Sequence, residues 1–184
     1  LYDLQPPINL LAEDLASLPP IRWERYFVHG SHYEGAIPSG VTPLVLNAGT
    51  AFGSGEHPTT GGCLLALDRL ARHKQFKRPL DVGCGSGILS IAAAKTWNVP
   101  VLAADIDPES VLVTKANAKL NQVDDLIQSV CSDGYKHRRI STSGSYDLIT
   151  ANILARPLAK LAKDLSHALA KGGTAVISGI IERD

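Results

Sequence analysis

Apolar residues along the chain fall into two recurring patterns: short apolar runs, and longer stretches with apolar positions three or four residues apart. Short runs bounded by turn residues are typical of buried strands, whereas the longer spacing is typical of amphipathic helices. From about residue 58 onward the two patterns alternate. The predicted strands are 79–83, 100–105, 126–131, 146–151 and 173–178, and the predicted helices are 58–72, 87–97, 108–121 and 155–169.

Alternating strands and helices of this length predict βαβ units, so the expected fold class is α/β with a mostly parallel sheet and helices on both faces. The segment 133–144 is expected to be a loop. Upstream of the alternation, residues 25–29 and 43–47 predict two short strands separated by a polar loop. Apolar positions at helical spacing within residues 1–20, ended by Pro19-Pro20, predict a short helix.

The composition narrows the range of functions. Lys plus Arg and Asp plus Glu number 18 each, and this balance argues against extensive direct binding of nucleic acid. The 3 cysteines are widely spaced, fit no zinc or disulfide pattern, and indicate a reducing compartment such as the cytoplasm. No metal site is therefore predicted. No apolar run approaches the roughly 20 residues that span a bilayer, so no membrane partner is expected.

The strongest local motif is a glycine-rich turn, residues 80–87, where the strand 79–83 meets the following helix. Glycines permit a sharp turn and close approach to a ligand, and ligands of open α/β sheets lie at the carboxyl ends of strands. Gly83 and Gly85 are therefore candidate ligand-binding positions. A tight turn that binds nothing is the alternative. The dinucleotide fingerprint G-x-G-x-x-G/A fails because Ile88 occupies its last position, which argues against a dehydrogenase.

Two acids near strand ends are further candidates. Asp105 ends the second strand of the alternation, about 20 residues beyond the glycines, where a carboxylate can accept hydrogen bonds from ribose hydroxyls. Asp107 is interpreted as the N-cap of the next helix. Asp133 follows the third strand, where a carboxylate could accept from an adenine amine. Capping or solvation alone remains the alternative for all three acids.

Two other segments are more distinctive. Residues 51–60 place a flexible glycine-containing loop before Thr59 and Thr60, whose hydroxyls and free N–H groups begin a helix. Such a loop could close over a ligand and hold its carboxylate. Residues 150–154 place Asn152 at the end of a strand, facing the same cleft.

Taken together, these segments resemble the ribosomal protein L-eleven methyltransferase family, PrmA. The family motifs AFGTGxHxTT, DxGCGSGILxIAA, DIDP, ANIL and SGI correspond here to AFGSGEHPTT, DVGCGSGILSIAA, DIDP, ANIL and SGI, in that order. The resemblance covers roughly residues 21–184. Ser54 stands where the family usually has Thr, which preserves a hydroxyl. The resemblance implies a Rossmann-like core dependent on S-adenosyl-L-methionine.

The resemblance also implies roles for particular residues. Thr60, Gly83, Asp105 and Asn152 would contact the cofactor, with Thr59 and Phe52 nearby. We expect Asn152 to be catalytic as well, its side-chain carbonyl orienting the amine that receives the methyl group.

The substrate implied is a ribosomal large-subunit protein, methylated on lysine side chains and its N-terminal amine in the cytoplasm. Residues 1–20 are then expected to link to an N-terminal substrate-recognition domain outside this chain. Residues 21–50 would lead into the core, and 51–184 would be a catalytic domain truncated at its C-terminus. A methyltransferase of another substrate, or a non-catalytic nucleotide-binding module, remains the alternative.

Four other features are interpreted conservatively. His57 could be a general base, but a role in structuring its loop is favoured. Cys84 lies inside the glycine turn and is expected to pack rather than react. The residues His29, His32 and Glu34 are expected to be surface residues rather than metal ligands. The basic run 136–139 is expected to be a solvated loop, with contact to ribosomal RNA as the alternative.

Overall fold

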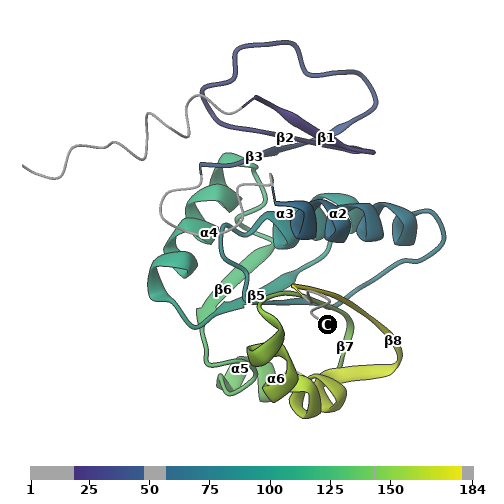
Figure 1. The fold of residues 1–184 in the computed structure, drawn as a ribbon, viewed down its shortest axis with the longest axis vertical. Helices are drawn as coiled ribbons and strands as arrows, with labels where there is room; N and C mark the ends of the chain where they lie inside the picture. The colour runs from purple at the N-terminus through teal and green to yellow at the C-terminus, as the bar shows by residue number, and fades with distance from the viewer. Residues whose placement is uncertain (1–18, 48–56, 143, 180–184) are drawn as a thin grey trace, which may run out of the picture.

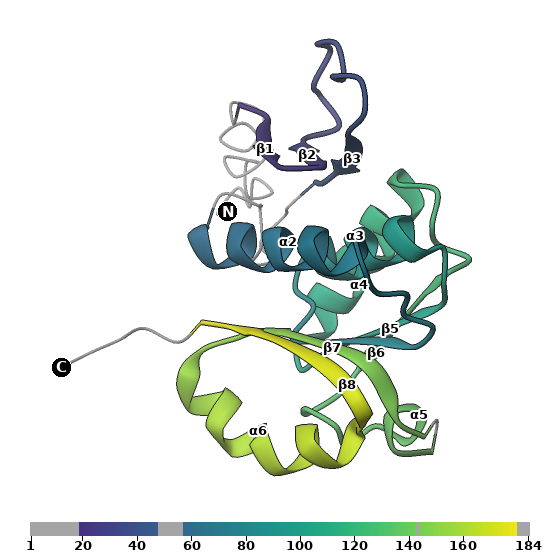
Figure 2. The same ribbon diagram turned by 90° about the vertical axis from the view of Figure 1, so that its right-hand side faces the viewer.

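A computed structural model describes residues 19–47, 57–142 and 144–179 of the protein. These residues form a five-stranded sheet covered by helices on both faces, and a separate three-stranded sheet (Figures 1 and 2). The helix predicted within residues 1–20 lies outside the described residues. Within the described ranges, no helix combines the length and the apolar character needed to cross a membrane.

The main sheet is entirely parallel. Its strands are β4 (Pro79–Val82), β5 (Val101–Asp105), β6 (Ile127–Cys131), β7 (Tyr146–Asn152) and β8 (Leu169–Ser178). They lie in the order β6-β5-β4-β7-β8, so the order in which strands are added to the sheet reverses between β4 and β7. The predicted α/β class with a parallel sheet is confirmed. In such sheets the ligand crevice lies at the carboxyl ends of the strands at this reversal point.

Helices cover both faces of the main sheet, as predicted. One face carries α2 (Pro58–Ala71), α3 (Ile88–Trp97) and α4 (Pro108–Leu120), and the other carries α5 (Arg138–Thr142) and α6 (Ala155–Ala168) (Figure 2). Neighbouring residues of a strand face opposite sides, so Leu148 packs into the apolar cluster under α2 and α3, while Ile149 packs into the cluster under α5 and α6.

The segment 133–144 is not only a loop, because α5 lies within it. His137 accepts a hydrogen bond at Nδ1 from the backbone N–H of Arg139 (3.2 Å), in the manner of a helix N-cap. Ile140 is buried against the sheet. The loop prediction was therefore wrong for residues 138–142, because a single buried apolar residue in a five-residue helix leaves no periodic signal.

Strand β8 is longer than predicted. It begins at Leu169 rather than 173 and continues through Gly172 and Gly173 to pair with β7, with an irregular register near Tyr146. The predicted start was wrong because two glycines normally indicate a turn, whereas here the ladder with β7 overrides that local preference.

The small sheet consists of β1 (Ile21–Trp23), β2 (Tyr26–His29) and β3 (Thr42–Val45). Strands β2 and β3 match the two predicted short strands and pair in parallel, whereas β1 was not predicted and pairs antiparallel with β2. Three residues are too few to show a period. The sheet lies beyond α2 and α3, on the side away from the main sheet (Figures 1 and 2).

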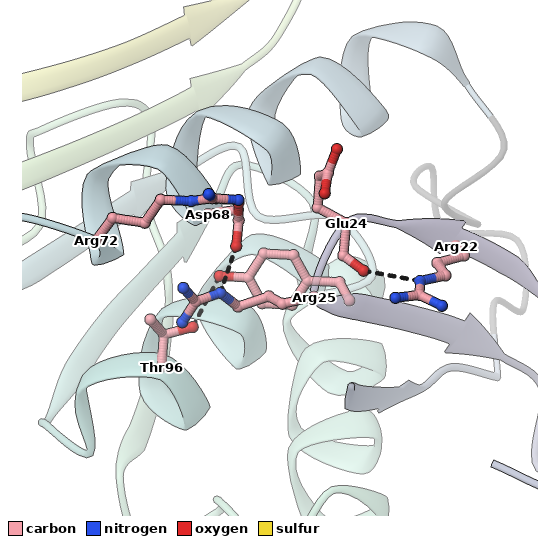
Figure 3. A network of polar contacts seen from close by, with 7 residues as sticks. Arg22, Glu24, Arg25, Asp68, Arg72 and Thr96 are labelled. Carbon is pink, nitrogen blue, oxygen red and sulfur yellow. Dashed lines mark hydrogen bonds and ion pairs between the residues drawn. The ribbon is translucent and has the colours of Figure 1, made fainter. Parts of the chain in front are cut away.

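Polar contacts attach the small sheet to the helices (Figure 3). The buried carboxylate of Asp68 in α2 binds Arg25, between β1 and β2, and Arg72, one helical turn further along the chain. The hydroxyl of Tyr26 lies 2.7 Å from Oγ1 of Thr96 in α3. Each contact joins residues far apart in the chain, except the Asp68–Arg72 pair.

Candidate functional site

The glycine turn at the end of β4 adopts the left-handed backbone that its sequence predicts. Gly83, Gly85 and Gly87 have φ of 73°, 52° and 82°. Residues other than glycine rarely adopt such values. The N–H groups of Gly83 and Cys84 both donate to the carbonyl of Ala104 in β5 (2.8 and 3.1 Å). The turn is thus fixed to the end of the neighbouring strand.

Asp105 ends β5 directly beside this turn. Its Oδ2 accepts a hydrogen bond from the N–H of Gly85 (2.8 Å), and its Oδ1 accepts one from the N–H of Asp107 (3.0 Å). An ionised carboxylate has about four acceptor positions, so both oxygens can accept further hydrogen bonds. The carboxylate is therefore oriented by the protein and still able to bind hydroxyl groups of a ligand.

Asp107 is the N-cap of α4, as the sequence indicated. Its side chain accepts from the N–H groups of Glu109 (3.0 Å) and Ser110 (3.1 Å) and from the Ser110 hydroxyl (2.8 Å). The Ser110 hydroxyl and the two N–H groups lower the pKa of the Asp107 carboxyl. Asp107 therefore caps a helix, whereas Asp105, two positions earlier, lines the cavity.

Asn152 at the end of β7 meets the first turn of α2. Its Nδ2 donates to Oγ1 of Thr60 (3.1 Å), and this orients the amide so that Oδ1 remains as the acceptor. Thr60 is fully buried and lies behind Asn152. Thr59, next to it, bonds through Oγ1 to Nδ1 of His57 (2.7 Å), the N-cap of α2.

A cavity of about 590 Å³ connects these residues. Its size falls in the range of about 300–1,000 Å³ typical of small-molecule sites. The structure brings six of the predicted site residues to its wall: Thr59, Gly83, Gly85, Asp105, Asp133 and Asn152. His57 also lines it, while Phe52 lies outside the described residues. A larger hollow of about 1010 Å³ lies at the amino ends of the strands, away from the glycine turn.

Asp133 lies at the wall but is not a free carboxylate. Its Oδ2 forms an exposed ion pair with Nζ of Lys136. Lys136 belongs to the basic run 136–139, of which Arg138 and Arg139 begin α5 rather than lying in a solvated loop. An ionised carboxylate has about four acceptor positions, so Asp133 can still accept hydrogen bonds from a ligand beside this ion pair.

The sequence patterns missed the apolar side of the cavity. Ile106 and Leu154 line it and are 66% and 72% exposed. Each closely follows a polar residue at a strand end, Asp105 or Asn152. The signal that could have identified them is a large apolar residue one or two positions after a polar strand end, because the chain there has left the sheet and its core.

Asp81 supports the site from below. The buried carboxyl accepts hydrogen bonds from the hydroxyls of Ser90 in α3 (2.6 Å) and Thr150 in β7 (2.7 Å). Burial raises the pKa of this carboxyl, and the two hydroxyls only partly oppose that effect. Asp81 thereby connects the two strands that carry the glycine turn and Asn152.

Cys84 packs, as expected. It is buried, its sulfur lies 3.3 Å from Oγ1 of Thr114, and burial raises the pKa of the thiol, so the reactive thiolate is disfavoured. The ring of His29 packs at a tilt against Phe27 and Tyr33, with ring centroids 5.6 and 5.3 Å apart. In the part of the chain that the structure describes, no three His, Cys, Asp or Glu residues are grouped as a metal site would require.

The strand order, the glycine turn and the anchored strand-end carboxylate define the Rossmann-like fold class of S-adenosylmethionine-dependent methyltransferases. Residues 12–184 match the sequence profile of one family within that class, "Ribosomal protein L11 methyltransferase (PrmA)". The chain belongs to this family.

Individual relatives agree with this assignment. A ribosomal protein L11 methyltransferase of Mesorhizobium japonicum is 45% identical over 181 residues, which are 98% of this chain and 62% of the relative. One of Caulobacter sp. is 46% identical over 171 residues, covering 93% of this chain and 59% of the relative. The chain thus spans about three fifths of the length of the curated relatives it matches.

Solved structures show the same fold. The ribosomal protein L11 methylase of Lactobacillus delbrueckii subsp. bulgaricus superposes with a TM-score of 0.75 at 33% identity, over 87% of this chain and 79% of that one. An RNA methyltransferase of Salinibacter ruber, solved with S-adenosyl-L-homocysteine, gives a TM-score of 0.53 at 25% identity, over 62% and 72% of the two chains.

Proposed function

We propose that this chain binds S-adenosyl-L-methionine in the 590 Å³ cavity and transfers its methyl group to amines of a large-subunit ribosomal protein. One observation carries the proposal: Asp105, fixed by the N–H of Gly85, stands at the cavity wall beside the glycine turn. This arrangement offers a carboxylate to ribose hydroxyls and a backbone without side chains to the rest of the ligand.

Three further residues complete the proposed cofactor site. Thr59 lines the cavity at the start of α2, and Asp133 offers an oxygen near the end of β6. Ile106 supplies an exposed apolar surface for a flat, apolar part of the ligand. Thr60 acts through Asn152 in this proposal, because Thr60 is buried and bonds to the Asn152 amide.

Asn152 is proposed to orient the acceptor amine. The cofactor's sulfonium supplies a reactive methyl group, so the protein's main task is alignment. A lysine amine with an ordinary pKa must lose a proton first, which costs about 4 kcal/mol near neutral pH. Because Nδ2 of Asn152 is held by Thr60, its Oδ1 is available to accept a hydrogen bond from the amine, after solvent has taken up the amine's proton, and to align the nitrogen lone pair with the methyl group.

The substrate proposal rests on the relatives, which are named for methylation of ribosomal protein L11. Lysine side chains and the N-terminal amine are the proposed acceptors, and the cytoplasm, where ribosomes work, is the proposed location. We infer no extensive contact with nucleic acid, since the chain carries no net charge.

The test is methyl transfer by the intact protein. It is incubated with methyl-labelled S-adenosylmethionine and with ribosomal proteins from cells lacking the enzyme, and the labelled protein is identified. We expect label on one large-subunit protein, and a loss of at least tenfold in cofactor affinity for Asp105→Asn. Asp107→Asn is the matched control, since asparagine caps helices as well as aspartate. Cofactor binding without label on any ribosomal protein would point instead to another substrate or to a binding module.

A further inference from the structure

Helix α4 presents a buried polar stripe where an apolar one is usual. Thr114, Asn117 and Asn121 lie at positions that share one helix face, and their exposed fractions are 0%, 0% and 5%. Buried polar side chains require hydrogen-bond partners, so the partners of this stripe indicate what it is for.

Thr114 contacts two glycines of the turn. Its Oγ1 donates to the carbonyl of Gly85 (2.9 Å). Its methyl group lies so close to Gly87 that a Cβ there would stand 2.9 Å from Thr114 Cγ2. The N–H of Gly85 meanwhile donates to Asp105. Gly85 is therefore held by Thr114 at its carbonyl and by Asp105 at its N–H.

Asn117 joins the turn to a distant segment. Its Nδ2 donates to the carbonyl of Ser86 (2.8 Å), and its Oδ1 accepts from the N–H of Asn47 (3.0 Å). Asn47 is 70 residues away in the chain, just beyond β3. One amide thus satisfies a backbone carbonyl of the glycine turn and a backbone N–H of the segment that follows the small sheet.

Asn121 has the same chemistry but different partners. Its Oδ1 accepts from the N–H of Val45 (3.0 Å), and its Nδ2 donates to the carbonyls of Val45 (2.6 Å) and Asn117 (2.8 Å). These hydrogen bonds hold β3 and the α4 backbone rather than the glycine turn. Asn121 is therefore a matched control for Asn117.

We propose that Thr114 and Asn117 are positioning residues that hold the glycine turn in the shape that binds the cofactor. The inference rests on the proposed function, in which this turn contacts S-adenosylmethionine. Neither residue lines the cavity, so each acts through the backbone of Gly85 or Ser86. When either hydrogen bond is removed, the turn keeps its sequence but samples other shapes, and cofactor affinity falls.

The first test compares Asn117→Asp with Asn121→Asp in the intact protein. Both changes replace a donor amide with a second oxygen on the same buried helix face. The dissociation constant for S-adenosyl-L-homocysteine is measured by calorimetry, well below the melting temperature of each variant. We expect a rise of about tenfold or more for Asn117→Asp, and a value within about twofold of wild type for Asn121→Asp. Equal rises in the two variants would overturn the proposal.

A second pair tests Thr114 with little change in volume. Thr114→Val removes the hydroxyl and leaves the Gly85 carbonyl unsatisfied, whereas Thr114→Ser keeps the hydroxyl. We expect Thr114→Val to raise the dissociation constant roughly tenfold and Thr114→Ser to restore it. Wild-type affinity in Thr114→Val, in a protein that binds the ligand before mutation, would contradict the inference alone. Failure of the unmutated protein to bind would remove the proposed function on which the inference depends.

Discussion

Asn152 donates a hydrogen bond from Nδ2 to Oγ1 of Thr60, a residue 92 positions earlier in the chain. The bond joins the end of β7 to the first turn of α2. It fixes which end of the Asn152 amide faces the cavity. It also joins segment 150–154 to segment 51–60, which are far apart in the sequence.

Asn152→Ala is expected to lower the rate of methyl transfer about 100-fold, because the acceptor amine loses the group that orients it. Thr60→Val, which frees the Asn152 amide to rotate, is expected to give a smaller loss of about tenfold. Thr60→Ser keeps the hydroxyl and is the control. Steady-state rates and cofactor affinity are measured for all three. Unchanged turnover and unchanged cofactor affinity in Asn152→Ala would remove Asn152 from the proposed site.

Gly83→Ala is expected to damage both stability and cofactor binding. Gly83 has φ of 73°, and a Cβ there would lie 2.2 Å from Cγ2 of Ile153. The expected loss is roughly 2–4 kcal/mol of unfolding free energy, with cofactor affinity reduced at least tenfold. Gly40→Ala is the matched control, because Gly40 has φ of 74° but open space around it. It should lose only about 1 kcal/mol and bind normally. Equal binding by the two variants in calorimetry would contradict the prediction.

Asp68→Asn is expected to weaken the attachment of the small sheet in a pH-dependent way. Burial alone raises the pKa of the Asp68 carboxyl, but the hydrogen bonds and charges of Arg25 and Arg72 outweigh it and lower that pKa. A lowered pKa contributes stability above the unfolded value of about 3.9, and this contribution disappears as the pH falls through the folded value.

Urea unfolding of wild type and Asp68→Asn should therefore differ by about 1–3 kcal/mol at pH 7, a modest value because both arginines are partly exposed. The difference should shrink as the pH falls below about 4. A difference that stays constant down to pH 3 would show that charge is not its cause.

Asp81→Asn is expected to have the opposite pH dependence. The pKa of the Asp81 carboxyl is raised by burial, so its contribution to stability is present below about pH 3.9 and is lost as the pH rises through the raised value. Relative to wild type, the variant should gain stability as the pH rises from 4 to 8. The unfolding free energies of wild type and Asp81→Asn are measured at several pH values. A difference between them that does not change with pH would refute the prediction.

Much of the fold could be predicted because its determinants are local. The alternation of apolar runs predicted the parallel sheet, and Asp107 before Pro108 predicted the start of α4. The position of Asp105 at the end of β5 followed from the same alternation. These features depend on residues that are neighbours in the chain, so they can be predicted from one sequence alone.

The rest depends on contacts between distant segments. The pairing of Arg25 with Asp68 spans 43 residues, and nothing in either segment indicates the other. Only the packing of α2 against β7 shows that Thr60 is buried and accepts a hydrogen bond from Asn152. Helix α5 depends on the burial of Ile140, and the polar stripe of α4 is understood only when its partners are known.

The hydrogen bond from Gly85 to Asp105 has a consequence for how a ligand is received. The turn is ordered by the protein's own carboxylate before any ligand arrives, so the entropy of ordering it is lost on folding and not on binding. The amide proton of Gly85 should accordingly exchange slowly with solvent even in the ligand-free protein. The affinity for a ligand at this edge of the cavity is then determined by desolvation and shape complementarity. The association rate is not limited by formation of the turn.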